Sequence, residues 1–186
     1  MFCRNCKKKL NKKIIDIGSQ CISSVFPPKI KKNFKKYSLD LFICSYCELV
    51  QFKKTPPLQD MYGTTYGYNT SLSPLMVKHI KEKFKSINKK KFLNNSSYVL
   101  DIGSNDGTFL NFFAKKKFDN LYAIDPSSKK FKNFYDKKIK LITSYFSKNE
   151  INNNIEDKKI KFDLITSYAM FYDIEDPNSF CKDINN

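Results

Sequence analysis

The pattern of apolar and polar positions predicts a run of short strands in the second half of the chain. Compact apolar runs rich in β-branched and aromatic residues lie at 98–102, 121–125, 139–142 and 162–166, each followed by polar or turn-forming residues. Apolar residues at helical spacing separate them, first over 108–113 and again from 126 to 135. Strands that alternate with helices predict an α/β fold with a parallel sheet.

A tight turn follows the first of these strands. Gly103 and Gly107 allow the backbone to bend sharply and to approach a ligand without an intervening Cβ. Asp101 stands at the carboxyl end of the strand, where open α/β sheets bind ligands. Asp125 ends the next strand about 20 residues after the turn, which is the place of an acid that holds ribose hydroxyls.

The sequence D-I-G-S-N-D-G-T-F-L at 101–110, with A-I-D-P-S at 123–127, resembles the first two motifs of class I methyltransferases that use S-adenosylmethionine (SAM). The S-N-D-G form is similar to the sugar C-methyltransferase group. This resemblance implies a Rossmann-like methyltransferase sheet. It also implies a set of SAM-binding residues: Asp101, Gly103, Ser104, Asn105, Asp106, Gly107, Thr108, Phe109, Asp125, Pro126, Tyr145 and Phe146.

Two other interpretations of the glycine turn stay open. A dinucleotide-binding G-x-G-x-x-G motif would need a third glycine where Leu110 stands, and the spacing here is G-x-x-x-G. A glycine turn without a ligand, in some other α/β domain, is the second interpretation.

Four cysteines near the N-terminus have the spacing of a metal site. Cys3-x-x-Cys6 and Cys44-x-x-Cys47 supply four thiolates, the number that a tetrahedral structural Zn²⁺ site needs. Redox chemistry or chance is the alternative. Cys21 has no partner at ligand spacing, and neither does Cys181.

The N-terminal segment also carries a resemblance. C-x-x-C, D-I-G-S-Q, F-P-P and C-S-Y-C-E-L-V-Q-F, in that order, resemble the zinc-binding domain that precedes sugar C-methyltransferase domains. Glu48 stands where the family has glycine, and Cys21 where it commonly has proline.

A segment rich in Tyr, Thr and Gly joins the two halves at 61–71. In the resembling family a Y-x-Y-x-S-x-S segment reaches the SAM and substrate pocket, and Tyr66, Tyr68 and Ser71 fit that pattern. The two tyrosines therefore join the predicted cofactor-binding residues. A turn with packed aromatic rings is the alternative. Ser73-Pro74 then predicts a helix with an N-cap and an N1 proline.

The segment after the fourth strand is where this fold places acid–base residues. The Asn/Asp-Pro-Pro-aromatic element of amino-methyltransferases is absent from 167–177. Tyr172 and Asp173 occupy the positions of the Glu-His pair of sugar C-methyltransferases, so they are the catalytic candidates. They could equally belong to the start of a helix that begins at Asp176-Pro177.

The predicted organisation is a zinc-binding module at 1–58, a Tyr-rich linker and helix at 59–95, and the N-terminal part of a SAM-binding methyltransferase domain at 96–186. The family's sheet has seven strands and the sequence supplies four. We therefore expect a fragment that is not a competent enzyme alone, and that associates with itself or with a missing C-terminal half.

Charge and composition narrow the partners. The net charge is +16, but Arg4 is the only arginine among 34 basic residues. Bidentate recognition of phosphates and bases favours arginine, so we interpret the lysines as a solvated surface and do not expect a nucleic-acid partner. The resemblance to sugar C-methyltransferases implies a sugar nucleotide as the substrate. The alternative is a basic zinc ribbon that binds nucleic acid, joined to an RNA methyltransferase or a non-catalytic SAM-binding platform.

Two absences bear on location. The sequence contains no run of 18 apolar residues, the length that would predict a transmembrane helix, so no membrane partner is expected. The N-terminus carries no apolar leader, so we expect a cytoplasmic protein, where paired cysteines more often bind metal than form disulfides.

Overall fold

The computed structural model describes residues 1–23, 25, 26, 29, 33–63, 65–158 and 160–185. Pro27 and Pro28 of the F-P-P motif lie outside these residues. The chain forms two compact units, which are described one at a time. Unit 1 comprises Met1–Gly67 and Met170–Asn186, and unit 2 comprises Tyr68–Ala169.

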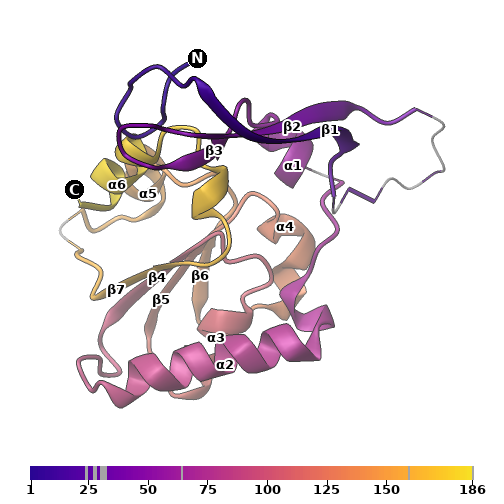
Figure 1. The fold of residues 1–186 in the computed structure, drawn as a ribbon. Coiled ribbons are helices and arrows are strands. Elements are labelled where there is room, and N and C mark those ends of the chain that lie inside the picture. The colour runs from indigo at the N-terminus through magenta and orange to yellow at the C-terminus, as the bar shows by residue number, and fades with distance from the viewer. Residues whose placement is uncertain (24, 27–28, 30–32, 64, 159, 186) are drawn as a thin grey trace. The chain divides into compact units, whose positions relative to one another are not determined.

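Unit 1 contains an antiparallel sheet of β1 (Lys12–Cys21), β2 (Lys36–Ile43) and β3 (Val50–Phe52), in that order (Figure 1). Asp16 of β1 pairs with Asp40 of β2, and Ile43 of β2 pairs with Val50 of β3. The helices of the unit are α1 (Leu58–Tyr62), η3 (Phe171–Asp173) and α6 (Pro177–Asn185).

Polar contacts join the C-terminal segment of unit 1 to its N-terminus. The Arg4 Nη1 donates to the carbonyl of Ile174 at 3.5 Å, and Asn178 Nδ2 donates to the carbonyl of Asn5 at 2.8 Å. Lys7 forms an ion pair with Asp176 at 3.6 Å. The segment after residue 169 therefore packs with the cysteine-rich segment, while the predicted domain boundaries stay a prediction.

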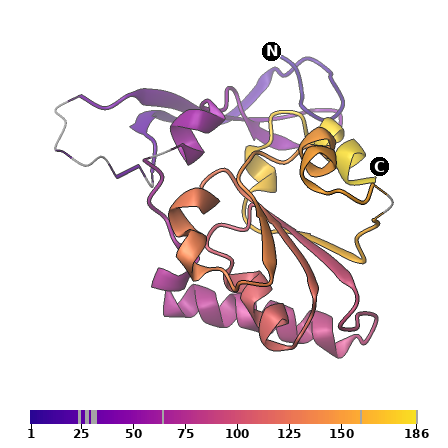
Figure 2. The ribbon, with the colours of Figure 1, turned by 180° about the vertical axis from the view of Figure 1, so that it is seen from behind.

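Unit 2 is built on four parallel strands, β4 (Tyr98–Ile102), β5 (Asn120–Ile124), β6 (Ile139–Ile142) and β7 (Leu164–Ser167). Their order in the sheet is β6-β5-β4-β7, and Figure 2 shows them from behind. In register, Asp101 pairs with Ala123 of β5 and with Thr166 of β7. This arrangement confirms the predicted α/β fold with a four-stranded parallel sheet.

The helical elements of unit 2 are η1 (Thr70–Leu72), α2 (Pro74–Lys89), α3 (Thr108–Lys115), α4 (Ser128–Phe131), η2 (Lys132–Phe134) and α5 (Lys148–Asn154). The α2 helix starts as predicted, because the Ser73 side chain accepts from the Met76 N–H and Pro74 occupies the first turn. Among the residues that the structure describes, no helix is long and apolar enough to cross a bilayer.

The core of unit 2 lies between the sheet and the pair α2 and α3. The fully buried Phe113 of α3 packs edge-on against Phe84 of α2, with ring centroids 4.8 Å apart. Val99 and Leu121 contribute from the strands. Because α3 is held between α2 and the sheet, its first residue and the loop before it are fixed at the carboxyl end of β4.

Candidate cofactor and metal sites

The loop from β4 to α3 has the backbone that the two glycines predict. Gly103, Asn105 and Gly107 have positive φ angles of 71°, 51° and 75°. A Cβ on Gly107 would lie 2.5 Å from the ring of Tyr135. Glycine is therefore required at Gly107 both by the left-handed backbone and by the close approach of a neighbouring ring.

Asp101 is a buried carboxyl group at the end of β4. Its Oδ1 accepts a hydrogen bond from Thr166 Oγ1 at 2.6 Å. Burial raises the pKa of Asp101 to about 7, the Thr166 hydrogen bond lowers it, and the charge of Asp125 raises it further. Near neutral pH this group can therefore both accept and donate a proton.

Asp125 lies directly after β5 and helps to hold the glycine loop. Its carboxylate accepts from the N–H of Asn105 at 2.9 Å and from the N–H and hydroxyl of Ser127. Burial raises the pKa of Asp125, and these hydrogen bonds oppose the shift. Burial raises the pKa of the Tyr145 hydroxyl, and the charge of Asp125 raises it further.

Tyr135 holds the glycine loop through hydrogen bonds of its hydroxyl group, a role that the sequence did not indicate. Its hydroxyl donates to the carbonyl of Asn105 at 2.7 Å and lies 2.8 Å from the Ser104 hydroxyl. Burial raises the pKa of Tyr135, so the hydroxyl stays protonated and can donate.

The segment at 68–71 is tied to the glycine loop by side chains of that loop. Asn105 Oδ1 accepts from the Thr70 N–H at 2.9 Å, and Asn105 Nδ2 donates to the carbonyl of Tyr68 at 3.1 Å. Asp106 Oδ2 accepts from the Ser71 N–H at 2.7 Å. The backbone of 68–71 therefore lies beside the glycine loop, while the role of Tyr68 and Ser71 in the SAM pocket stays a prediction.

The other predicted SAM-binding residues of unit 2 differ in accessibility. Thr108 and Pro126 are partly exposed, as is Phe146, whereas Asp106 is buried and its Oδ1 accepts from the Thr108 N–H. Phe109 is 3% exposed and packs on Tyr168 in the core, so its side chain supports the loop from inside.

Ser167, at the end of β7, was not singled out from the sequence. Its buried Oγ has no hydrogen-bond partner among the described residues, and it pairs in register with Ile102 beside the glycine loop. Buried hydroxyl groups are normally paired, so this one is a candidate to meet a polar group of a ligand.

The remaining candidates belong to unit 1. Tyr66 packs edge-on against Tyr62, with centroids 5.3 Å apart, and Tyr172 is exposed. Asp173 is half-buried and accepts a hydrogen bond from the Tyr62 hydroxyl. Burial raises the pKa of Asp173, and the Tyr62 hydrogen bond and the charge of Arg4 oppose the rise.

The four predicted metal ligands come together in unit 1. The Sγ atoms of Cys3, Cys6, Cys44 and Cys47 all lie within 4.8 Å of one another, and two of the pairs are 3.5 Å apart. Tetrahedral Zn²⁺ with sulfur ligands at about 2.3 Å would place sulfurs about 3.8 Å apart. The four cysteines therefore form a site for structural zinc.

The backbone around the second cysteine pair, Cys44 and Cys47, favours the thiolate form of these side chains, which is the form that binds metal. A backbone hydrogen bond from Leu49 lowers the pKa of the Cys47 thiol to about 6. The backbone N–H groups of Cys47 and Tyr46 likewise lower the pKa of Cys44. Cys21 and Cys181 are exposed and are not part of the cluster.

Two family models match the chain. A model described as "Methyltransferase domain" matches residues 76–186, which is more than half of the sequence. The chain belongs to this methyltransferase family. A model described as "Putative zinc binding domain" matches residues 3–62. The two cofactors predicted from the sequence, SAM and structural zinc, agree with these two family models.

Comparison with solved structures matches, among others, the plantazolicin methyltransferase BpumL, crystallised with a pentazolic desmethylPZN analog and SAH. The identity is 22% and the TM-score 0.47, and the match covers 60% of this chain and 42% of that chain. The match thus spans less than half the length of that methyltransferase. Comparison with curated proteins gives no match.

Proposed function

We propose that the protein is a SAM-dependent methyltransferase that methylates a carbon atom of a sugar nucleotide. The observation that carries the cofactor part is a pair of buried acids at the carboxyl ends of adjacent strands, Asp101 near the end of β4 and Asp125 directly after β5, beside the glycine loop. The order of a zinc-binding domain and a methyltransferase domain supports the sugar part, through the resemblance to sugar C-methyltransferases.

In this proposal the loop 103–107 takes the methionine part of SAM, and Asp125 accepts hydrogen bonds from the ribose hydroxyls. Tyr145 and Phe146, which follow β6, take the adenine, and Ser167 Oγ pairs with a polar group of the ligand. Tyr68 and Ser71 close the site from the segment that Asn105 and Asp106 hold. Bound there, SAM supplies an electrophilic methyl group on its sulfonium sulfur.

The residues of the chain then have to remove a proton from the carbon next to a carbonyl of the sugar. Asp173 is our candidate base, because burial raises its pKa and makes it a better proton acceptor than an exposed carboxylate. The Tyr62 hydroxyl holds its carboxylate in place. Tyr172 stays a second candidate. Orienting the enolate toward the methyl group is the larger part of such catalysis.

Calorimetric titration with S-adenosylhomocysteine tests the cofactor part. Asp125→Ala removes the acceptor for the ribose and should weaken binding by about 1.5–3 kcal/mol. Asp119→Ala is the matched control, since Asp119 is an exposed acid of the same unit and its loss changes the net charge equally. Gly103→Val puts a branched side chain at a φ of 71° and should abolish binding. Unchanged affinity in both Asp125→Ala and Gly103→Val would refute this site.

Methyl transfer with ¹³C-methyl SAM and a keto-sugar nucleotide tests the acceptor. Carbon–carbon coupling in the NMR spectrum of the product identifies methylation at carbon, and Asp173→Asn should remove the product. A product formed by this chain alone would contradict the expectation that it is not competent without a partner. A methyl group on oxygen would overturn the proposed acceptor chemistry while leaving the cofactor site intact. A cytoplasmic location is part of the proposal, since reduced cysteines are what a zinc site requires.

A further inference from the structure

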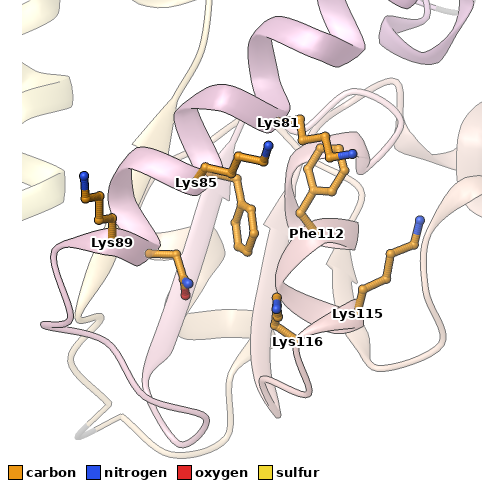
Figure 3. A pocket seen from close by; sticks show the side chains of 8 residues that line it. Lys81, Lys85, Lys89, Phe112, Lys115 and Lys116 are labelled. Atoms are coloured by element: carbon orange, nitrogen blue, oxygen red, sulfur yellow. The ribbon is translucent and has the colours of Figure 1, made fainter.

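A concave surface of unit 2 lies between α2 and α3. It is a groove of about 450 Å³, within the range of ligand sites in proteins. Five lysines and an asparagine surround two phenylalanines. The α2 helix contributes Lys81, Phe84, Lys85, Asn88 and Lys89; α3 contributes Phe112 and Lys115, and Lys116 directly follows it. Figure 3 shows lysine side chains from both helices around this groove.

The groove carries an uncompensated positive charge. Lys81, Lys85 and Lys89 have no hydrogen bond or ion pair with any described residue, and no acidic residue is part of the lining. Elsewhere lysines do have such partners, as with Lys35 and Asp60 at 2.6 Å. A helix dipole favours Lys89 at the end of α2, but Lys81 and Lys85 lie in the middle of the helix, so the dipole does not explain them.

The lysines of α2 form a row. Lys81, Lys85 and Lys89 are each four residues apart, so they lie on one side of the helix and extend over about 12 Å. This length exceeds that of a single phosphate and suits several phosphates in series. Lys115 and Lys116 add positive charge from the other helix.

An aromatic ring lies within this charged frame. Phe112 is partly exposed and is stacked on the buried Phe84, with centroids 5.7 Å apart and an angle of 27° between the rings. Phe84 therefore supports Phe112 from the core side. A rigid aromatic ring between lysines is the combination with which proteins bind single strands, through base stacking and phosphate attraction.

The geometry points to a binding site for single-stranded nucleic acid in the groove between α2 and α3, one that does not depend on base sequence. Lysine suits this role, because it attracts phosphates as a point charge without the bidentate geometry that reads bases. The expectation from composition, that the lysines are only a solvated surface, is thereby revised for these five residues.

The groove is distinct from the proposed cofactor site. The glycine loop precedes Thr108 at the start of α3, whereas Lys115 ends the helix, roughly 10 Å away along its axis. An acidic peptide would satisfy the lysines but gives no role to the Phe112 ring. A membrane surface would need a protruding apolar side chain, and Phe112 lies in a hollow.

Fluorescence anisotropy of the zinc-loaded chain with labelled oligo(dT) and oligo(rU) tests the inference. Replacing Lys81, Lys85 and Lys115 together with Gln should weaken binding by about tenfold or more at low salt, and should reduce the slope of log K against log[salt] by about 2. The matched control replaces Lys129, Lys132 and Lys137, three exposed lysines outside the groove lining, with Gln. It has the same net charge and should bind like the unchanged chain.

The role of the ring is tested separately. Phe112→Leu keeps apolar packing and should weaken oligo(dT) binding by about fivefold or more, with little effect on an abasic oligonucleotide of equal length. Circular dichroism checks that both variants are folded. Equal losses in the groove and control triple variants would overturn the inference, as would polyglutamate or anionic vesicles binding as tightly as oligo(dT). Titration with S-adenosylhomocysteine is independent, so the cofactor site and the groove can fail separately.

Discussion

The two units of the chain reach stability by different physical means. In unit 1 the buried cluster comprises Cys3, Leu10 and Cys44, Phe180 of α6 is a further buried apolar residue, and every residue of β1 is exposed. In unit 2 Val99, Leu121 and Phe113 are fully buried, in a core that joins two helices to a sheet. Small domains with little core usually need a metal or disulfides, whereas a parallel sheet needs burial.

This difference teaches where each part of the chain is vulnerable. Unit 1 should depend on four thiolates and hardly on any single apolar side chain. Unit 2 should depend on apolar packing and on the close fit of its glycine loop, and should be indifferent to metal. The predictions below test this contrast from the largest expected effect to the smallest.

Removing a zinc ligand should have the largest effect, and only on unit 1. Structural zinc sites contribute about 10–16 kcal/mol of binding free energy that is coupled to folding, so Cys44→Ser should unfold the unit. Metal analysis of protein purified without added zinc should give about one Zn²⁺ per unchanged chain, and much less for the variant. Hydrogen exchange should show lost protection in β1 and β2 but not in β4 and β5.

The control for this change is Cys21→Ser, because Cys21 is an exposed cysteine in the same unit outside the cluster. It should keep both the zinc and the protection. A metal-free chain that is as well protected as the zinc-loaded one would contradict the contrast between the units.

Deleting a core ring should affect only unit 2. Phe113 is fully buried and its ring contacts Phe84, Phe109 and Phe118. Phe113→Ala should therefore lower the free energy of unfolding of unit 2 by about 3–5 kcal/mol and leave zinc content unchanged. Phe92→Ala is the control, since this ring is 53% exposed and its loss should cost less than about 0.5 kcal/mol.

A pair of glycines sharpens the comparison, because their backbones are alike and their surroundings differ. Gly18 of β1 has a φ of 73° with nothing within 4 Å of an added Cβ, while Gly107 has a φ of 75° with the Tyr135 ring at 2.5 Å. Gly18→Ala should cost about 1–2 kcal/mol from backbone strain alone. Gly107→Ala should add about 1–3 kcal/mol from overpacking.

Thermal denaturation and hydrogen exchange measure both glycine variants. The larger loss at Gly107 should be accompanied by weaker binding of S-adenosylhomocysteine, since Tyr135 also bonds the loop at Ser104 and Asn105. Equal losses of stability for the two variants would mean that the Tyr135 ring moves aside without a measurable free-energy cost, which would contradict the prediction.

The strands, the glycine loop and the zinc ligands could be predicted from the sequence because their signals are local. A run such as 98–102 is apolar as a whole, and two C-x-x-C pairs carry their ligand spacing in themselves. The strand predicted at 121–125 is β5, which ends at Ile124, and Asp125 follows it with its carboxylate accepting from the Ser127 N–H.

The contacts that support the sites could not be predicted, since they join residues far apart in sequence. Tyr135 meets Ser104 across 31 positions, Thr166 meets Asp101 across 65, and Tyr62 meets Asp173 across 111. One partner of each pair was singled out from the sequence, whereas the other, Tyr135, Thr166 or Tyr62, was not. The groove between α2 and α3 could not be predicted either, because the lysine spacing along α2 does not reveal which helix packs beside it.

The smallest predicted effect concerns opposite pH trends in the two units. In unit 1, hydrogen bonds from Lys13 lower the pKa of Asp16, and those from Lys35 and Tyr37 lower the pKa of Asp60. Their stabilising contribution is present above the unfolded-state pKa near 4 and is lost as the pH falls through the folded-state values. In unit 2, burial raises the pKa of Asp101 to about 7, so the folded state binds the extra proton between pH 4 and 7.

Stability contributed by protonated Asp101 is therefore fully present below about pH 4 and is lost as the pH rises toward 7. Asp101→Asn keeps an oxygen that can accept from Thr166, but the amide side chain cannot ionise. The free energy of unfolding of unit 2 should therefore fall by about 1–3 kcal/mol less between pH 4 and 7 than it does in the unchanged chain. Protection factors of amides in β4 and β5, measured from pH 4 to 7, report the effect. Asp119→Asn, at an exposed site, should follow the unchanged chain. If Asp101→Asn follows it as well, Asp101 ionises like an exposed carboxyl group.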